Sequence, residues 1–96
     1  MVTGITGFLG ASVVARLLQL GAEVYGVARS PQSNLSTHVL IGDLTDPDFV
    51  HTTFREAKPE IVLHLAGQTN ASTDKMLILP TFQGNLETTV NVLTAA

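Results

Sequence analysis

The sequence predicts an α/β fold built on a parallel sheet, and two kinds of observation support this. Apolar segments of strand length alternate along the chain with amphipathic segments of helical length, and a glycine-rich turn joins the first pair. The composition agrees, because 45% of the 96 residues are hydrophobic and only 14% are charged. Such a composition suits strands that helices cover on both faces.

The first half of the chain divides at its glycines and prolines. Apolar residues recur at helical spacing after the glycine-rich turn, and Gly21 can end that helix in a left-handed conformation. The polar segment with Pro31 is expected to be a loop. The predicted elements are a strand at 1–3, a helix at 8–20, a strand at 23–28, a polar loop at 29–37 and a strand ending near Ile41.

The second half is expected to hold two helices and a buried strand. Thr45 or Asp46 can cap a helix that has Pro47 at its first position. The nearly unbroken apolar run at 61–66 suits a buried parallel strand. A loop is predicted at 67–80 and a last helix from about 81 to 96. The expected apolar faces are Phe49, Val50, Phe54 and Ala57 in the first helix, and Leu86, Val90 and Leu93 in the last.

The turn "TGITGFLG" has glycines at positions 4, 7 and 10, where a strand gives way to a helix. In this context the first glycine allows a tight turn, the second admits a pyrophosphate, and the third lets helix and strand pack closely. The new helix directs its positive end at the anion. A dinucleotide site is therefore predicted. The alternative is a tight helix entry without a ligand.

This turn resembles that of the extended short-chain dehydrogenase/reductase family, within it the nucleotide-sugar epimerases and dehydratases, including GDP-mannose 4,6-dehydratase-like members. Further stretches resemble the family in the same order: "GDLTD", "KPEIV", "IVLHLAGQT" and "GNLETTVNVLTAA". The resemblance covers essentially the whole chain. It implies a Rossmann-type doubly wound parallel sheet, here expected to be truncated at both ends, and a chain that is the N-terminal part of a dinucleotide-binding domain.

The resemblance also implies a set of cofactor-binding residues. The glycine-rich turn would hold the pyrophosphate, Asp43 would meet the adenine amino group and Leu44 its face. The segment after the fourth strand would line the inner ribose and the nicotinamide side. The candidate residues are Gly4, Thr6, Gly7, Phe8, Leu9, Gly10, Arg29, Ser30, Asp43, Leu44, Leu65, Ala66, Gly67 and Gln68.

The chain departs from the family pattern at several positions. Gly67 stands where the extended members usually have Ala, and Thr88 where Gly is usual. The family's catalytic Tyr-x-x-x-Lys pair is missing, because the sole tyrosine is Tyr25 and Arg29 stands four residues later. We expect that pair and the substrate domain beyond residue 96. No catalytic residue is therefore assigned, and the 96 residues alone are expected to be inactive and unstable.

Arg29 favours NADP as the cofactor, with NAD as the alternative. It follows the second strand, where NAD-binding forms carry an acidic residue for the ribose hydroxyls, and an arginine can instead meet a 2′-phosphate. Asp43 could also be a turn or cap residue. His64 is expected to be a packed core histidine, with a catalytic role as the alternative. Asn85 could bond the backbone of the neighbouring strand or merely begin the last helix.

Composition excludes several partners. The net charge of −3 gives no basic footprint for nucleic acid or an anionic membrane. No apolar run approaches a spanning helix, and three scattered histidines without cysteine predict no metal site. We expect a cytoplasmic, homodimeric enzyme that acts on a nucleotide sugar by transient hydride transfer. The alternatives are an NADP-dependent carbonyl reductase and a dinucleotide-binding sensor without turnover.

Overall fold

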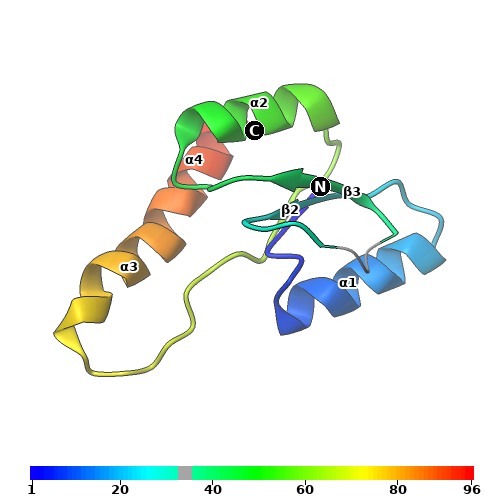
Figure 1. Ribbon diagram of the computed structural model, residues 1–96. Helices are drawn as coiled ribbons and strands as arrows, with labels where there is room; N and C mark the ends of the chain where they lie inside the picture. The colour runs from blue at the N-terminus through cyan, green and yellow to red at the C-terminus, as the bar shows by residue number, and fades with distance from the viewer. Residues whose placement is uncertain (33–35) are drawn as a thin grey trace.

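Four parallel strands lie side by side in the order β3-β2-β1-β4. The computed structural model describes residues 1–32 and 36–96 (Figure 1). The strands are β1 (Val2–Thr3), β2 (Tyr25–Ala28), β3 (His38–Ile41) and β4 (Leu63–His64). In the register, Thr3 lies opposite Val27 on one side and opposite His64 on the other. The chain therefore leaves β1 at the centre of the sheet and fills one side before it crosses to β4.

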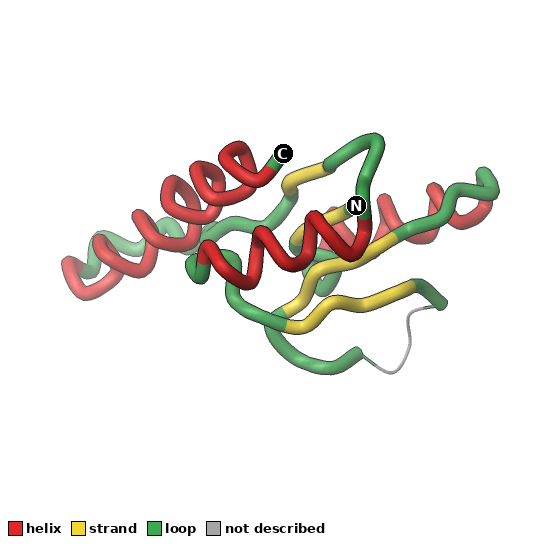
Figure 2. Tube along the Cα trace, turned by 90° about the horizontal axis from the view of Figure 1, so that it is seen from above, coloured by secondary structure: helices red, strands yellow, loops and turns green. Residues whose placement is uncertain are grey.

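Helices cover both faces of this sheet (Figures 1 and 2). Helix α1 (Phe8–Gln19) packs Val14 against Val2 and Ile5 on one face. Helices α2 (Pro47–Ala57) and α4 (Thr88–Ala95) pack Val50 and Val92 on the opposite face. This doubly wound arrangement confirms the predicted Rossmann-type α/β fold.

The ends of α1 and α2 follow the predicted signals. Gly21 has a φ of +79° just after α1, where a left-handed residue ends a helix. The Asp46 carboxylate accepts hydrogen bonds from the N–H groups of Asp48 and Phe49, and Pro47 is the first residue of α2. Of the two caps considered, Asp46 is the one that the structure uses. The predicted polar loop at 29–37 includes residues 33–35, which lie outside the described residues.

Two strands are shorter than the sequence predicts. Strand β2 begins at Tyr25 rather than at residue 23. The run at 61–66 pairs with β1 only over Leu63–His64, is half-buried rather than buried, and begins at Ile61, which is 70% exposed. Among the described residues β4 is an edge strand, so its outer side has no neighbour to bury it. The prediction of a fully buried strand is therefore wrong for this chain.

The predicted loop at 67–80 contains the start of the last helix. A 3₁₀ turn at Lys75–Leu77 leads into α3 (Ile78–Phe82), a π-helical segment, η2, follows at Gln83–Glu87, and α4 continues from it. Asp74 starts the helical path by accepting a hydrogen bond from the Met76 N–H. The helix thus begins before residue 81, and Pro80 lies within the first turn of α3, where a missing N–H costs little.

The predicted apolar face of the last helix is also wrong as a core face. Leu86, Val90 and Leu93 share one side of the helix, but each is more than half exposed. The buried side instead carries Thr88 and Val92. Periodicity finds which residues share a face, and it does not distinguish a face that meets the sheet from one that faces solvent.

Candidate functional site

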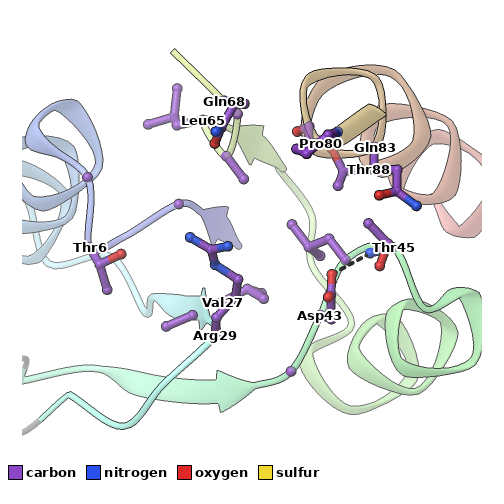
Figure 3. Close-up of a pocket in the computed structure, with 18 residues that line it drawn as sticks. Thr6, Val27, Arg29, Asp43, Thr45, Leu65, Gln68, Pro80, Gln83 and Thr88 are labelled. Carbon is purple, nitrogen blue, oxygen red and sulfur yellow. Dashed lines mark hydrogen bonds between the residues drawn. The ribbon is translucent and has the colours of Figure 1, made fainter. Parts of the chain in front are cut away.

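A cleft of about 470 Å³ opens at the carboxyl ends of all four strands (Figure 3). In doubly wound sheets ligands bind at this edge, at the point where the strand order reverses. Here the reversal falls between β1 and β4. The lining residues are Gly4, Thr6, Gly7, Val27, Ala28, Arg29, Gly42, Asp43, Leu44, Thr45, Leu65, Ala66, Gly67, Gln68, Pro80, Gln83, Gly84 and Thr88.

Two glycines of the first turn are required by the protein's own packing. Gly4 has a φ of +69°, and a Cβ there would lie 2.7 Å from the Ala66 nitrogen. A Cβ on Gly10 would lie 2.1 Å from the Gly4 carbonyl oxygen. Neither backbone contact can move aside easily, so side chains are excluded at both positions whether or not a ligand is present.

Gly7 is different, because little in the protein occupies the space beside it. A Cβ on Gly7 would meet only the Gly4 carbonyl oxygen, at 3.3 Å, a tight contact that a shift of a few tenths of an ångström would relieve. Its φ of −75° is one that any residue can adopt. Gly7 is also the N-cap of α1, yet no side chain caps this helix and no acidic residue lies in its first turn. The positive helix end therefore faces the cleft without an anionic partner among the described side chains.

Arg29 and Asp43 lie at the part of the cleft formed by β2 and β3. The Arg29 guanidinium points into the cleft (Figure 3). Asp43 Oδ1 accepts a hydrogen bond from the Thr45 N–H at 2.9 Å. Hydrogen bonds from the Thr45 backbone and side chain, with a smaller contribution from the Arg29 charge, hold the pKa of Asp43 below its usual value. Asp43 is thus a turn residue that also presents an ionised carboxylate to the cleft.

Asn85 holds the segment after β4, which lines the opposite side of the cleft, through two hydrogen bonds to Gln68. Its side-chain oxygen accepts from the Gln68 N–H at 2.6 Å, and its amide nitrogen donates to the Gln68 carbonyl at 3.1 Å. Of the two roles considered, the backbone bond is the one observed, since Asn85 lies inside the helical path. Gly67 leaves room for this amide, because a Cβ on it would lie 2.9 Å from Asn85 Oδ1.

Most of the candidate cofactor-binding residues meet at this cleft, and four do not line it. Phe8 and Leu9 are exposed in the first turn of α1, and Gly10 is buried against Gly4. Ser30 is exposed, and its carbonyl and hydroxyl oxygens accept hydrogen bonds from Gln32. For Phe8, Leu9 and Gly10, the backbone N–H groups rather than the side chains are what the helix end offers to an anion.

Some lining residues were missed by the sequence analysis. Pro80, Gln83, Gly84 and Thr88 reach the cleft from the helical path that follows β4, and Thr45 reaches it from the start of α2. "GDLTD" and "GNLETT" contain three of them, so proximity to those motifs was an available signal. Pro80 had none, because it fell in the predicted loop at 67–80. Gln83 fell in the predicted last helix, but no motif marked it as a residue of the site.

Neither a metal centre nor a membrane span is found in the part of the chain that the structure describes. Among residues 1–32 and 36–96, no group of three or more His, Cys, Asp or Glu side chains is placed to hold a metal ion. Within the same described ranges, no helix has the length and apolar character needed to cross a membrane.

The sequence profile of the NAD dependent epimerase/dehydratase family matches residues 1–96. The chain belongs to this family. Among curated proteins, the CDP-glucose 4,6-dehydratase of Salmonella typhimurium is 31% identical over 102 aligned positions, which cover 96% of this chain and 28% of that enzyme. The resemblance found from the sequence motifs is therefore confirmed.

Solved structures of the family superpose closely on this chain. The UDP-glucose 4-epimerase of Thermus thermophilus, in complex with NAD, is 32% identical with a TM-score of 0.88. The UDP-glucose 4-epimerase of Thermotoga maritima, solved with UDP-glucose, is 26% identical with a TM-score of 0.87. The matched region covers 98% of this chain and 32% of each structure. The chain thus spans about a third of the relatives it resembles.

Proposed function

We propose that this cleft binds a nicotinamide dinucleotide, with its pyrophosphate at the N-terminus of α1. The observation that carries the proposal is the space beside Gly7. A Cβ there would require only a small shift of the Gly4 carbonyl, far less than at Gly4 or Gly10, while the uncapped helix end next to it is suited to an anion. The residues present therefore fit the phosphates of such a cofactor.

The remaining candidate residues divide by position. Asp43 and Leu44 would contact the adenine, and Arg29 would contact the adenosine ribose or its 2′-phosphate. Ala66, Gly67 and Gln68 would line the inner ribose. The thermophilic epimerase that resembles this chain was solved with NAD. Arg29 nevertheless favours NADP here, since a guanidinium can offer two parallel, charge-assisted donors to a phosphate.

We propose further that the intact protein is a nucleotide-sugar epimerase or dehydratase. This rests on family membership and on relatives named as a 4,6-dehydratase and as 4-epimerases. When bound, the cofactor supplies the acceptor and later the donor of a hydride. The residues of this chain hold and orient it. The 96 residues contain no Tyr-x-x-x-Lys pair, so we expect no turnover from them alone.

The dinucleotide proposal is tested by calorimetric titration of NADP and NAD into the intact protein and its Gly7→Val variant. The valine methyl groups would fill the space assigned to the pyrophosphate, so we expect binding to fall below detection. Ala15→Val is the control, because Ala15 is exposed in α1 and does not line the cleft. Unchanged affinity in a folded Gly7→Val protein would contradict the assignment.

The activity is tested by incubating the intact protein with CDP- and UDP-glucose and separating the products. A 4-epimer or a 4-keto-6-deoxy sugar is the expected product. Oxidation of NADPH by simple carbonyl compounds, without conversion of either sugar nucleotide, would indicate a reductase instead. Dinucleotide binding without any turnover would indicate a sensor.

A further inference from the structure

A chain of hydrogen bonds crosses the sheet beside the cleft, and none of its side chains is assigned to the dinucleotide. His64 of β4 lies at its centre. Its Nδ1 lies 2.7 Å from Thr3 Oγ1, and its Nε2 lies 3.2 Å from Thr89 Oγ1. The imidazole therefore joins β1 to the helix that covers this face of the sheet.

The contacts of Thr3 fix the direction of the first hydrogen bond. Thr3 is fully buried, and its Oγ1 accepts from the N–H groups of Leu65 at 3.1 Å and Ala66 at 3.2 Å. A hydroxyl oxygen has two acceptor positions and one hydrogen to donate. Both acceptor positions are in use, so the hydroxyl hydrogen points to His64 Nδ1. That nitrogen must accept, and so it carries no proton.

The contacts on the other side agree with this direction. A neutral imidazole with a bare Nδ1 carries its hydrogen on Nε2 and can donate it to Thr89 Oγ1. Thr89 in turn donates to the Asn85 carbonyl at 2.5 Å. Burial lowers the pKa of His64, which favours the neutral ring. Each hydrogen bond in the path from Thr3 to Asn85 therefore has one donor and one acceptor, and the assignments do not conflict.

We propose that His64 is a positioning residue, held as the neutral Nε2–H tautomer, which fixes the main chain of Leu65 and Ala66 through the Thr3 hydroxyl. These two residues form part of the cleft wall. A proton on Nδ1 would face a Thr3 oxygen whose acceptor positions are already filled. One of the two backbone N–H groups would then lose its partner, and the wall would shift.

The tautomer is tested on the intact wild-type protein, without any ligand. A long-range ¹H–¹⁵N spectrum distinguishes the two neutral tautomers and the imidazolium, and the His64→Asn variant assigns the signal. His38 and His51 are both exposed and serve as internal references. We expect the Nε2–H pattern for His64 at neutral pH. An Nδ1–H pattern or an imidazolium would overturn the proposal.

The positioning role is tested by dinucleotide affinity, and this part rests on the proposed function. His64→Leu removes the acceptor for Thr3 and should weaken binding about tenfold, the effect of one hydrogen bond. His64→Asn keeps an acceptor near the position of Nδ1 and should stay within about threefold of wild type. Equal affinities of the leucine variant and wild type would overturn the role.

Failure of the proposed dinucleotide binding can be distinguished from failure of the positioning role of His64. If wild type binds no dinucleotide, the proposed function is wrong, and the tautomer spectrum still decides the state of His64. If wild type binds but the asparagine variant is as weak as the leucine variant, while both melt as wild type does, the acceptor toward Thr3 is not what matters and the positioning proposal fails.

Discussion

At the scale of residues, the three glycines of the first turn have different structural roles. Gly4 and Gly10 make room for each other and for the backbone of Ala66, so the fold alone explains them. Gly7 has an ordinary φ, and a Cβ there would meet only one atom, so the fold alone does not explain why a glycine stands at this position. The sequence motif predicted all three, but only the structure separates the packing glycines from the one that leaves room for a ligand.

Arg29 should set a preference for NADP over NAD. Hydrogen bonds to charged groups contribute roughly 1.5–3 kcal/mol each, and ~1.4 kcal/mol is a factor of ten. Replacing Arg29 by alanine should therefore lower the ratio of NADP to NAD affinity by about ten- to a hundredfold. The two dissociation constants, measured at moderate salt, give this ratio.

Arg16→Ala is the matched control for this experiment. It removes the same charge from the exposed side of α1, where Arg16 donates a hydrogen bond to Gln19. We expect its NADP to NAD ratio to equal that of wild type. If Arg29→Ala shifts the ratio no more than Arg16→Ala does, the preference for NADP should be abandoned, while dinucleotide binding would still stand.

His64 should make the stability of the protein fall in mild acid. Its pKa in the folded protein lies below the ordinary value of 6.5, because burial disfavours the charged ring. The facing groups, Thr3 from β1 and Thr89 from α4, are neutral hydroxyls. The contribution of His64 to the free energy of unfolding is fully present above the pKa that His64 has in the unfolded chain. It is lost as the pH falls from that value toward the lower pKa that His64 has in the folded protein.

The measurement compares wild type with His64→Asn in chemical unfolding between about pH 7.5 and 5.5, on either side of the ordinary histidine pKa. The asparagine does not titrate, so the free-energy difference between the two proteins should shrink as the pH is lowered. A constant difference would show that His64 keeps its ordinary pKa in the folded protein, and a growing difference would show that this pKa is raised. Either result would contradict the prediction.

At the scale of elements, α2 depends on a single side-chain cap. Asp46→Ala would leave the N–H groups of Asp48 and Phe49 without their carboxylate partner. Losing such a cap costs about 1 kcal/mol, so hydrogen exchange along α2 should accelerate about fivefold. Asp46→Asn keeps an acceptor and should exchange nearly as wild type does. Equal rates in the alanine variant would refute the capping role.

Elements with local signals were predictable, and elements set by distant contacts were not. The ends of α1 and α2 follow from Gly21, Asp46 and Pro47, which act within one helical turn. The extent of β4 depends on which strands flank it, and its apolar sequence could not reveal an edge position. The last helix starts early because Asp74 caps it. The sequence did not indicate this cap, because Asp74 lies among other polar residues that could equally belong to a loop.

The candidate site divides in the same way. Asp43 and Gln68 were predicted because "GDLTD" and "IVLHLAGQT" resemble motifs of the family, and the structure places both residues at the carboxyl edge of the sheet. Gln83 was not, since it reaches the cleft through a π-helical segment that the sequence pattern does not announce.

At the scale of the whole molecule, an apolar stripe runs along the helical path from the 3₁₀ turn to α4. Its members are Met76, Ile78, Leu79, Phe82, Leu86, Val90 and Leu93, with exposures between 51% and 81%. Contiguous exposed apolar surface of this kind is typical of an interface. The sequence analysis expected the intact protein to be a homodimer, and we propose that this stripe forms its interface.

Replacing Leu86 by lysine should break that dimer, because a charge would enter the middle of the apolar stripe. Sedimentation of the intact protein measures the change from dimer to monomer. Leu20→Lys is the control, since Leu20 is 65% exposed just after α1 and lies outside the stripe. A monomeric wild type, or a Leu86→Lys variant that remains dimeric, would contradict the proposed interface.

The central claim is that the N-terminus of α1 receives the pyrophosphate of a nicotinamide dinucleotide. A crystal structure of the intact protein grown with NADP tests this most directly. The account predicts phosphate oxygens within hydrogen-bond distance of the backbone N–H groups of Phe8, Leu9 or Gly10, with no protein atom between the phosphates and Gly7. A dinucleotide bound elsewhere, or phosphates that leave the space beside Gly7 empty, would contradict it.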